Sequence, residues 1–182
     1  MSLFLKTDLK KNSILILLLF CTAVLQALDQ EIDVYSMASG ITVEVSVKNL
    51  DRLLLIKTLQ EGLRCGITFE IRLYEKIKAV ADKYISSTII TREGKWDPFS
   101  ESYLISQNEE FYRFSDTLDH FFEAFLHLDN IYIPFEKSPD SQYYILCRVR
   151  VETLKFVPPF QILAPSMGIY FPSTSWEKYV IM

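Results

Sequence analysis

Three stretches of the chain alternate strictly between apolar and polar side chains. They are residues 41–47 (ITVEVSV), 67–77 (ITFEIRLYEKI) and 143–153 (YYILCRVRVET). A period of two is typical of a strand with one buried and one solvated face, and β-branched residues favour strands. We therefore predict three strands here, with Ile67, Phe69, Ile71 and Leu73 inward in the second and Tyr143, Ile145, Cys147, Val149 and Val151 inward in the third.

Two other stretches repeat with the period of a helix. In the first, leucines recur at Leu50, Leu53, Leu54, Leu59 and Leu63. Asn49 is a suitable N-cap, and Gly62 and Gly66 favour an end, so we predict a helix over about Leu50–Arg64. In the second, Ser115 is the predicted cap and Asp116 lies in the first turn. Its predicted buried stripe is Leu118, Phe121, Phe122, Phe125, Leu126 and Leu128.

The remaining segments carry weaker strand signals. We predict an irregular strand over Gln30–Gly40, a pair formed by Tyr84–Arg92 and Ser102–Ser106 around a turn at 93–98, a short strand over Ile131–Phe135, and an extended stretch from Pro158-Pro159 to Trp176. The aromatic-rich stretch from Trp96 to Phe135 is expected to form the densest part of the core. Together these segments predict an α+β fold: an antiparallel β-sandwich-like domain of about six or seven strands with two amphipathic helices.

The N-terminus has the pattern of a secretory signal peptide. Lys6, Lys10 and Lys11 precede an apolar run of 12 residues, Ile14–Leu25, which is shorter than the about 20 residues of a membrane-spanning helix. We predict cleavage after Ala27, so that 1–27 is a signal peptide and 28–182 a single globular domain. An uncleaved anchor is the alternative, as is lipidation at Cys21, although the bulky Phe20 before it does not fit a lipoprotein signal.

Charge excludes one class of partner. The chain has a net charge of −4, and removal of 1–27, with three lysines and one aspartate, brings it to −6. Nucleic-acid binding needs a basic face, so we predict no nucleic-acid partner. No run of lysine or arginine in the sequence predicts a surface for anionic lipid.

One group of residues has metal-like spacing. His120, Glu123 and His127 would share one face of the second predicted helix, and imidazole and carboxylate bind zinc or iron. That face is also the solvated side of an amphipathic helix, where polar residues are expected in any case. No phosphate-binding glycine loop or nucleophile elbow is present, so we predict no catalytic, cofactor-binding or metal-binding residues.

Two cysteines, two arginines and a group of aromatic residues are the remaining candidates for functional residues. Cys65 and Cys147 either pair in an oxidising compartment or remain buried free thiols. Arg148 and Arg150 are expected to face outward and to pair with Glu70 or Glu44 across the sheet, and contact with an anionic partner is the alternative. The aromatics Phe111, Phe114, Phe121, Phe122, Phe125, Tyr143 and Tyr144 are expected in the core rather than around a ligand.

A series of short motifs resembles a bacterial envelope family, the domain of unknown function 4390. They are the LxxxLxEGLxxGITFEI-like segment Leu55–Ile71, then Tyr103 and Phe111–Phe114, the helix start Phe114–Leu118, Cys147–Val151, and Leu154–Gln161 before Ser175-Trp176. Tyr74–Lys83 departs from the family pattern because it lacks arginine and tryptophan, and Ala124-Phe125 stands where the family has alanine-leucine. The resemblance implies secretion or membrane association and no established catalytic residues.

The sequence favours a secreted or membrane-associated envelope protein, in the periplasm or on the outer face of the inner membrane. We predict a non-enzymatic binding or assembly module with a protein partner and no cofactor. A carrier of an apolar or lipid-like ligand, held between sheet and helices, is the second hypothesis. A metal-dependent enzyme is the third. A membrane contact is expected only through an uncleaved signal or a lipid anchor.

Overall fold

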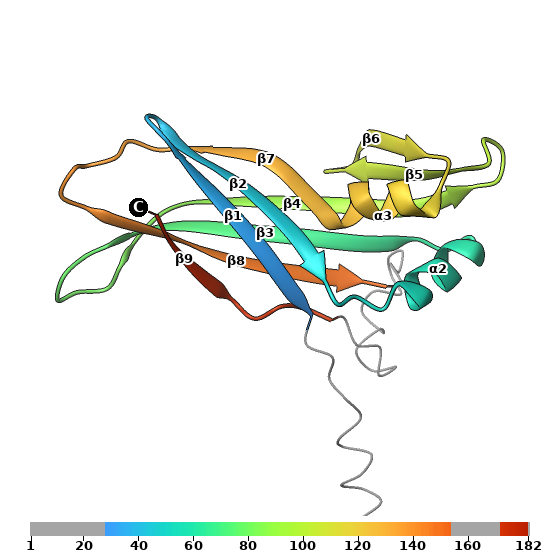
Figure 1. Cartoon of the computed structure of the whole chain (residues 1–182), viewed down its shortest axis with the longest axis horizontal. Coiled ribbons are helices and arrows are strands. Elements are labelled where there is room, and N and C mark those ends of the chain that lie inside the picture. The colour runs from blue at the N-terminus through green and yellow to red at the C-terminus, as the bar shows by residue number, and fades with distance from the viewer. Residues whose placement is uncertain (1–27, 154–171, 182) are drawn as a thin grey trace, which may run out of the picture.

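The alternating segments form antiparallel strands in the computed structural model, which describes residues 28–153 and 172–181. Nine strands and two helices lie along these residues (Figure 1). In order they are β1 (Asp29–Met37), β2 (Gly40–Lys48), α2 (Arg52–Gln60), β3 (Cys65–Lys76), β4 (Lys83–Asp97), β5 (Ser102–Gln107), β6 (Glu110–Ser115), α3 (Leu118–Leu126), β7 (His127–Pro134), β8 (Gln142–Glu152) and β9 (Glu177–Ile181).

The strands form two sheets. One has three strands in the order β1-β2-β7, and the other has six in the order β6-β5-β4-β3-β8-β9. All pairings are antiparallel. The smaller sheet crosses obliquely over the larger one, and α3 lies over the β4–β5 end (Figure 1). The predicted sandwich-like α+β fold is therefore confirmed, with nine strands in place of six or seven.

The core lies between the two sheets and under α3. Val43 and Val45 of β2, Phe69 of β3 and Val149 of β8 have no exposed surface. The predicted inward sides of β3 and β8 are buried throughout, since Ile67, Phe69, Ile71, Leu73, Tyr143, Ile145, Cys147, Val149 and Val151 are all buried. The period-two pattern therefore identified both faces of these strands.

The segment expected to be irregular is a regular strand. All nine residues of β1 pair with β2, from Asp29 opposite Lys48 to Met37 opposite Gly40. Only Gln30 and Ile32 of β1 are buried, so its outer end carries no apolar alternation. Backbone pairing with β2 stabilises this strand where side-chain pattern is weak.

The first helix is shorter than predicted. It begins at Arg52, and Asp51 rather than Asn49 is the N-cap, because the Asp51 carboxylate accepts a hydrogen bond from Leu53 N at 3.0 Å. Asn49 instead has a left-handed φ of 56° in the turn that leaves β2. The helix ends at Gln60, and Gly62 follows with a φ of 73°, as expected for a glycine that ends a helix.

The second helix is capped by Thr117, not by Ser115. Thr117 Oγ1 accepts a hydrogen bond from His120 N at 3.3 Å, whereas Ser115 is the last residue of β6. Phe121, Phe122, Phe125 and Leu126 are buried as predicted. Leu128 is also buried, but it belongs to β7, because the helix ends at Leu126.

The turn predicted at residues 93–98 lies further along the chain. β4 continues to Asp97, so Gly94 is inside the strand, opposite Ile105. A Cβ at Gly94 would lie 2.6 Å from Phe121 Cζ and 3.0 Å from Cys65 Sγ. Gly94 therefore provides the space into which α3 packs the fully buried ring of Phe121, and it is not a turn residue.

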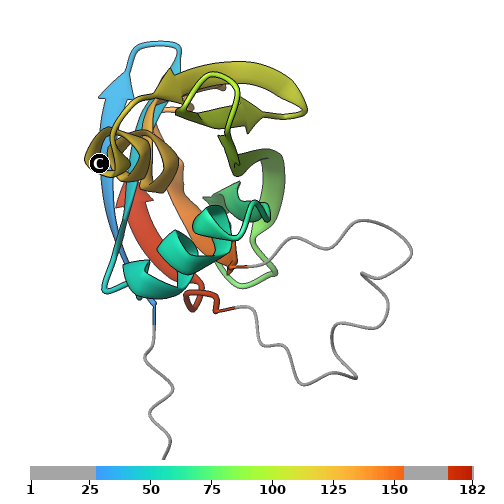
Figure 2. The same cartoon turned by 90° about the vertical axis from the view of Figure 1, so that its right-hand side faces the viewer.

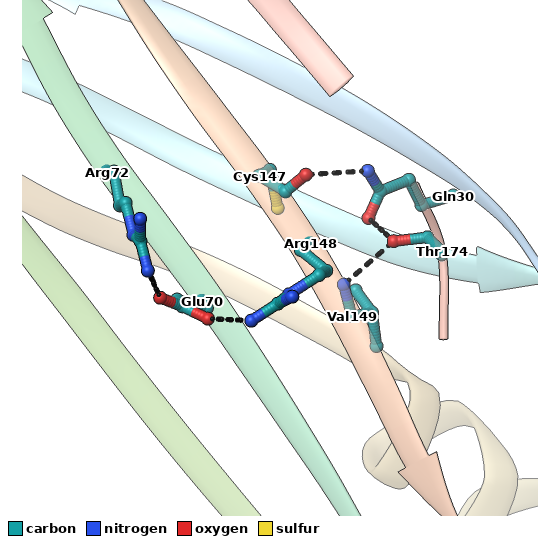
Figure 3. A network of polar contacts seen from close by, with 7 residues as sticks. All are labelled: Gln30, Glu70, Arg72, Cys147, Arg148, Val149 and Thr174. Carbon is teal, nitrogen blue, oxygen red and sulfur yellow. Dashed lines mark hydrogen bonds and ion pairs between the residues drawn. The ribbon is translucent and has the colours of Figure 1, made fainter. Parts of the chain in front are cut away.

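A buried polar bridge joins the two sheets at the β1–β9 side (Figure 3). Gln30 is buried, its Nε2 donates to the Cys147 carbonyl at 3.0 Å, and its Oε1 accepts from Thr174 Oγ1 at 3.0 Å. Thr174 Oγ1 in turn accepts from Val149 N at 2.9 Å. These bonds hold the segment before β9 against β8.

Some expectations concern residues outside the described ranges. They are the signal peptide at 1–27, Cys21, the Pro158-Pro159 break and the Leu154–Gln161 motif. Among the described residues, no helix has the length and apolar character needed to span a membrane.

Candidate functional site

The structure separates the three residues with metal-like spacing. His120 and Glu123 are on α3, but His127 is the first residue of β7, so the three do not share a helical face. His127 Nε2 lies 2.6 Å from Asp129 Oδ1, and His120 Nδ1 lies 3.6 Å from Asp116 Oδ1. No group of three potential metal ligands occurs in the described part of the chain. The helical metal arrangement is therefore wrong, because the helix ends one residue before His127.

The two described cysteines are free thiols in the core. Cys147 pairs with Ile71, and Cys65 lies six residues from Ile71 along β3, which places the two cysteines about 20 Å apart. A disulfide requires Cα atoms within about 7 Å. Burial raises the pKa of both thiols to about 12, so neither is a nucleophile at neutral pH.

The predicted cross-strand ion pair is formed by Arg148. Its guanidinium lies 2.8 Å from Glu70, the residue directly opposite on β3, and Arg72 Nε donates to the same carboxylate at 2.9 Å (Figure 3). The guanidinium carbons of Arg72 and Arg148 each lie 4.5 Å from the centre of the Trp176 ring. Burial alone would raise the pKa of Glu70, but the hydrogen bonds from the two arginines outweigh it and hold this pKa below its usual value.

On the outer face of the larger sheet, this cluster holds Trp176, just before β9, against β3 and β8. The carboxylate is satisfied by two arginines, and both arginines stack on the same tryptophan. The charged groups of this cluster are therefore paired with one another, which gives them a structural role in line with the predicted ion pair.

Two of the seven aromatics expected in the core are on the surface instead. Phe111 is 69% exposed and Phe114 is 64% exposed, whereas Phe121, Phe122, Phe125, Tyr143 and Tyr144 are buried. Both exposed rings belong to β6, which the sequence did not predict as a strand. β6 forms one edge of the six-stranded sheet, and within the described residues it pairs only with β5.

A β-bulge sets the direction of these side chains. Phe111 pairs with Ser106 and Phe114 with Leu104, two β5 residues that share a face, while Tyr112 is the extra residue between the pairs. Two residues three positions apart would face opposite sides of a regular strand, so the bulge brings Phe111 and Phe114 to the same side. We call this strand and its two phenylalanines the β6 edge.

A groove borders the β6 edge on the same face. It has a volume of about 450 Å³, and Phe111 and Leu104 line it together with the charged pair Arg64 and Glu93, whose side chains lie 2.8 Å apart. The groove is open to solvent and mixes apolar and charged walls. It continues the surface of the exposed phenylalanines as a recess on the same face.

The turn before β6 is fixed to β4. Asn108 and Glu109 both have left-handed φ angles, 50° and 71°, as in the tightest hairpin turns. Asn108 N donates to the Thr91 carbonyl at 2.8 Å, and Asn108 Oδ1 accepts from Thr91 N at 3.0 Å. The β5–β6 hairpin, which lies beside α3 at one end of the molecule (Figure 2), is thereby held at its turn.

A buried arginine holds the other side of the hairpin. Arg92 is only 2% exposed, and its guanidinium donates to Gln107 Oε1 at 2.9 Å and to the carbonyls of Ala124 at 2.6 Å and His127 at 2.5 Å. Its Cζ lies 4.7 Å from the Tyr112 ring. Arg92 therefore connects the bulge of β6 to the end of α3, and burial lowers its pKa.

The sequence contained one signal for this site. Phe111–Phe114 appear among the motifs of the family resemblance, but their side chains lack the alternation of a half-buried strand. An exposed edge strand with a bulge has no buried face, and therefore no period of two. Composition alone placed its aromatics in the core.

Comparison with known proteins gives one match. Residues 29–179 match the family described as Domain of unknown function (DUF4390). No curated protein and no solved structure matches the chain. The matched residues extend from the first residue of β1 into β9 and include the β6 edge. The chain therefore belongs to the DUF4390 family.

Proposed function

We propose that this protein is a non-enzymatic binding or assembly module that captures an extended segment of a protein partner along β6. The observation that carries the proposal is the exposure of Phe111 and Phe114 on a strand whose outer side is unpaired among the described residues. Natural edge strands are usually shortened, charged or covered. An edge that presents aromatic rings is suited to adding a strand from another chain.

Backbone hydrogen bonds supply the first part of the binding energy. The side of β6 that faces away from β5 presents N–H and C=O groups that an extended segment can pair with. Strand addition satisfies these groups in both partners and fixes the direction of the bound segment. The bound segment becomes the seventh strand of the larger sheet.

The two phenylalanines supply the apolar part. Both rings are about two-thirds exposed and lie on one face, next to the half-buried Leu104. Covering each ring contributes about 2 kcal/mol, so a partner with apolar side chains on that face gains several kcal/mol. The groove beside Phe111 gives one of these side chains a place to bind.

The β6 edge is organised before a partner arrives. Arg92 is hydrogen-bonded to Gln107 and packs against the Tyr112 ring, and the hydrogen bonds between Asn108 and Thr91 fix the turn. Little backbone ordering is then needed on binding, and a preorganised surface binds more tightly for the same contacts.

The proposed location follows from the N-terminal pattern of the sequence. We propose that the protein is exported and acts in the periplasm or on the outer face of the inner membrane, where its partner is another envelope protein. The carrier hypothesis has less support, since Val43, Val45, Phe69 and Val149 fill the space between the sheets. The enzyme hypothesis also has less support, since His127 lies on β7 and does not share a helical face with His120 and Glu123.

Native mass spectrometry of the full chain, isolated gently from its own cells, tests the proposal. Wild-type protein is compared with the double variant Phe111→Ser/Phe114→Ser. We expect the wild type to retain a protein partner at fixed stoichiometry and the double variant to lose it. Equal retention by the double variant would contradict the proposal.

A matched control excludes a general effect of removing surface aromatics. Tyr35 is 51% exposed and lies on β1, an edge strand of the smaller sheet. The variant Tyr35→Ser is expected to retain the partner as the wild type does. Thermal unfolding of all variants should be similar, because the replaced rings are largely in solvent.

A further inference from the structure

The connection between β3 and β4 forms a second exposed feature, at the opposite end of the molecule from β6, α2 and α3 (Figure 1). We call residues 76–83 (KIKAVADK) the hairpin tip. Val80 is 66% exposed and Ile77 is 38% exposed. Lys76, Lys78 and Lys83 are exposed around them. Apolar side chains inside a group of lysines suit a surface that is negatively charged outside and apolar beneath.

The one acidic residue of the hairpin tip, Asp82, is hydrogen-bonded to other groups of the protein. Asp82 accepts a hydrogen bond from the Tyr144 hydroxyl at 2.8 Å and one from Ile77 N at 3.3 Å. The neighbouring Glu75 accepts from Ser141 at 2.6 Å and pairs with Lys83 at 3.3 Å. Lys76 and Lys78 are exposed beside these carboxylates, and Lys178 lies close by with its Nζ 3.5 Å from the centre of the Tyr144 ring.

The backbone of the hairpin tip is held in one conformation. Ala79 has a φ of 69°, a left-handed value that a non-glycine residue keeps only where surrounding contacts fix it. The Asp82 bond to Ile77 N closes the loop across this residue. Behind it, Tyr74 stacks on Tyr144 at 5.3 Å and meets Tyr84 edge-on at 5.7 Å.

These features together match the chemistry of a lipid bilayer surface. Lysines near an anionic membrane are attracted to its phosphates, tyrosines favour the headgroup level, and apolar side chains favour the layer beneath. We propose that the hairpin tip docks on an anionic lipid surface, with Ile77 and Val80 between the headgroups and Lys76 and Lys78 on lipid phosphates. This inference does not depend on the β6 edge.

A fluorescent label at the tip of the full chain tests the proposal. Cys65 and Cys147 are buried and do not react, so with Cys21→Ser a cysteine at Val80→Cys takes an environment-sensitive dye alone. The probe surfaces are vesicles of phosphatidylcholine with or without phosphatidylglycerol. We expect a blue shift of the dye emission on vesicles with phosphatidylglycerol and little change on pure phosphatidylcholine, with the shift reduced by added salt.

Matched variants separate tip insertion from membrane binding by any other part of the chain. Leu53 is 76% exposed on α2, at the other end of the molecule, and a dye at Leu53→Cys is expected to show no shift. Lys76→Gln and Lys78→Gln should each weaken the tip response about fivefold. Lys57→Gln, at an exposed lysine of α2, should leave it unchanged.

Three results would overturn the proposal. One is the absence of any shift at position 80 on anionic vesicles. The second is an equal shift at positions 53 and 80, and the third is a tip response that survives loss of both Lys76 and Lys78. None of these results depends on whether β6 binds a partner, so the two proposals fail separately.

Discussion

Phe111 and Phe114 are three residues apart on β6, yet both rings lie on the same face of the sheet, opposite Ser106 and Leu104 of β5. The extra residue Tyr112 causes this, because it shifts the register by one position. Its own ring turns to the other face, 4.7 Å from the guanidinium carbon of the buried Arg92. One bulge therefore produces both an exposed aromatic pair and the contact that holds it in place.

Arg92 should be important for stability. Replacing it with methionine removes the donors to the carbonyls of Ala124 in α3 and His127 in β7 and to Gln107 in β5. Buried acceptors without a donor are costly, so we expect Arg92→Met to lower the free energy of unfolding by about 3 kcal/mol in urea titrations. Arg150→Met, at an exposed position on β8, should change it by less than about 0.5 kcal/mol. Equal effects of the two variants would exclude a structural role for Arg92.

A side chain at Gly94 should destabilise the protein while Phe121 is present. A Cβ there would lie 2.6 Å from Phe121 Cζ, and overpacking of this kind costs about 1–3 kcal/mol. We expect Gly94→Ala to destabilise the wild type by that amount in chemical denaturation. In a Phe121→Leu background the same substitution should cost clearly less, and an unchanged cost would contradict the contact.

Glu109 occupies a backbone conformation that suits glycine. Its φ is 71°, and its neighbour Asn108 also has a positive φ, so Asn-Gly is the preferred sequence for this turn. Relief of strain exceeds the entropy that glycine adds to the unfolded chain, so Glu109→Gly should stabilise the protein by about 0.5 kcal/mol. The adjacent Glu110→Gly, within β6, should destabilise it by about 1 kcal/mol. Melting temperatures that move in the same direction would show that the turn is not strained.

Glu70 should contribute to the loss of stability in acid. Its folded-state pKa lies below the ordinary value of about 4.3, so its contribution is present above that pH and is lost as the pH falls through the folded pKa. We expect Glu70→Gln to be less stable than wild type at pH 7 and to lose less stability on acidification. Arg148→Gln removes a hydrogen bond that lowers the Glu70 pKa, so in this variant the loss of stability that is due to Glu70 should occur at higher pH than in the wild type. Unfolding curves measured from pH 7 to pH 2.5 would reject this explanation if Glu70→Gln and wild type lost stability in parallel.

The parts of the fold that could be predicted from sequence are those with one buried face. β3 and β8 alternate because each has a wet side and a dry side, and their inward residues were all identified. The pattern also predicted that Arg148 faces outward and left Glu70 and Glu44 as its possible partners, and the structure places Glu70 opposite it. Helix boundaries were less predictable, because Asn49, Asp51, Ser115 and Thr117 are all good caps and only the backbone selects among them.

The candidate site could not be predicted, for a physical reason. β6 has both faces largely in solvent, so no apolar period marks it as a strand, and its phenylalanines resemble core residues in composition. Gly94 was misassigned to a turn because a glycine that makes room for a ring looks the same in sequence as a glycine that bends the chain. The lysines of the hairpin tip do not form a continuous run in the sequence, so they were not predicted to form a charged surface. Folding brings Lys178 of β9 close to them.

The most direct test of the central claim is hydrogen exchange of the β6 amides in the chain alone and in the complex with its retained partner. A strand added at this edge must pair with the outward N–H groups, so we predict that exchange within residues 110–115 slows on binding while exchange in β1 stays the same. Slowed exchange elsewhere, with the β6 amides unchanged, would contradict capture of a partner by strand addition at β6.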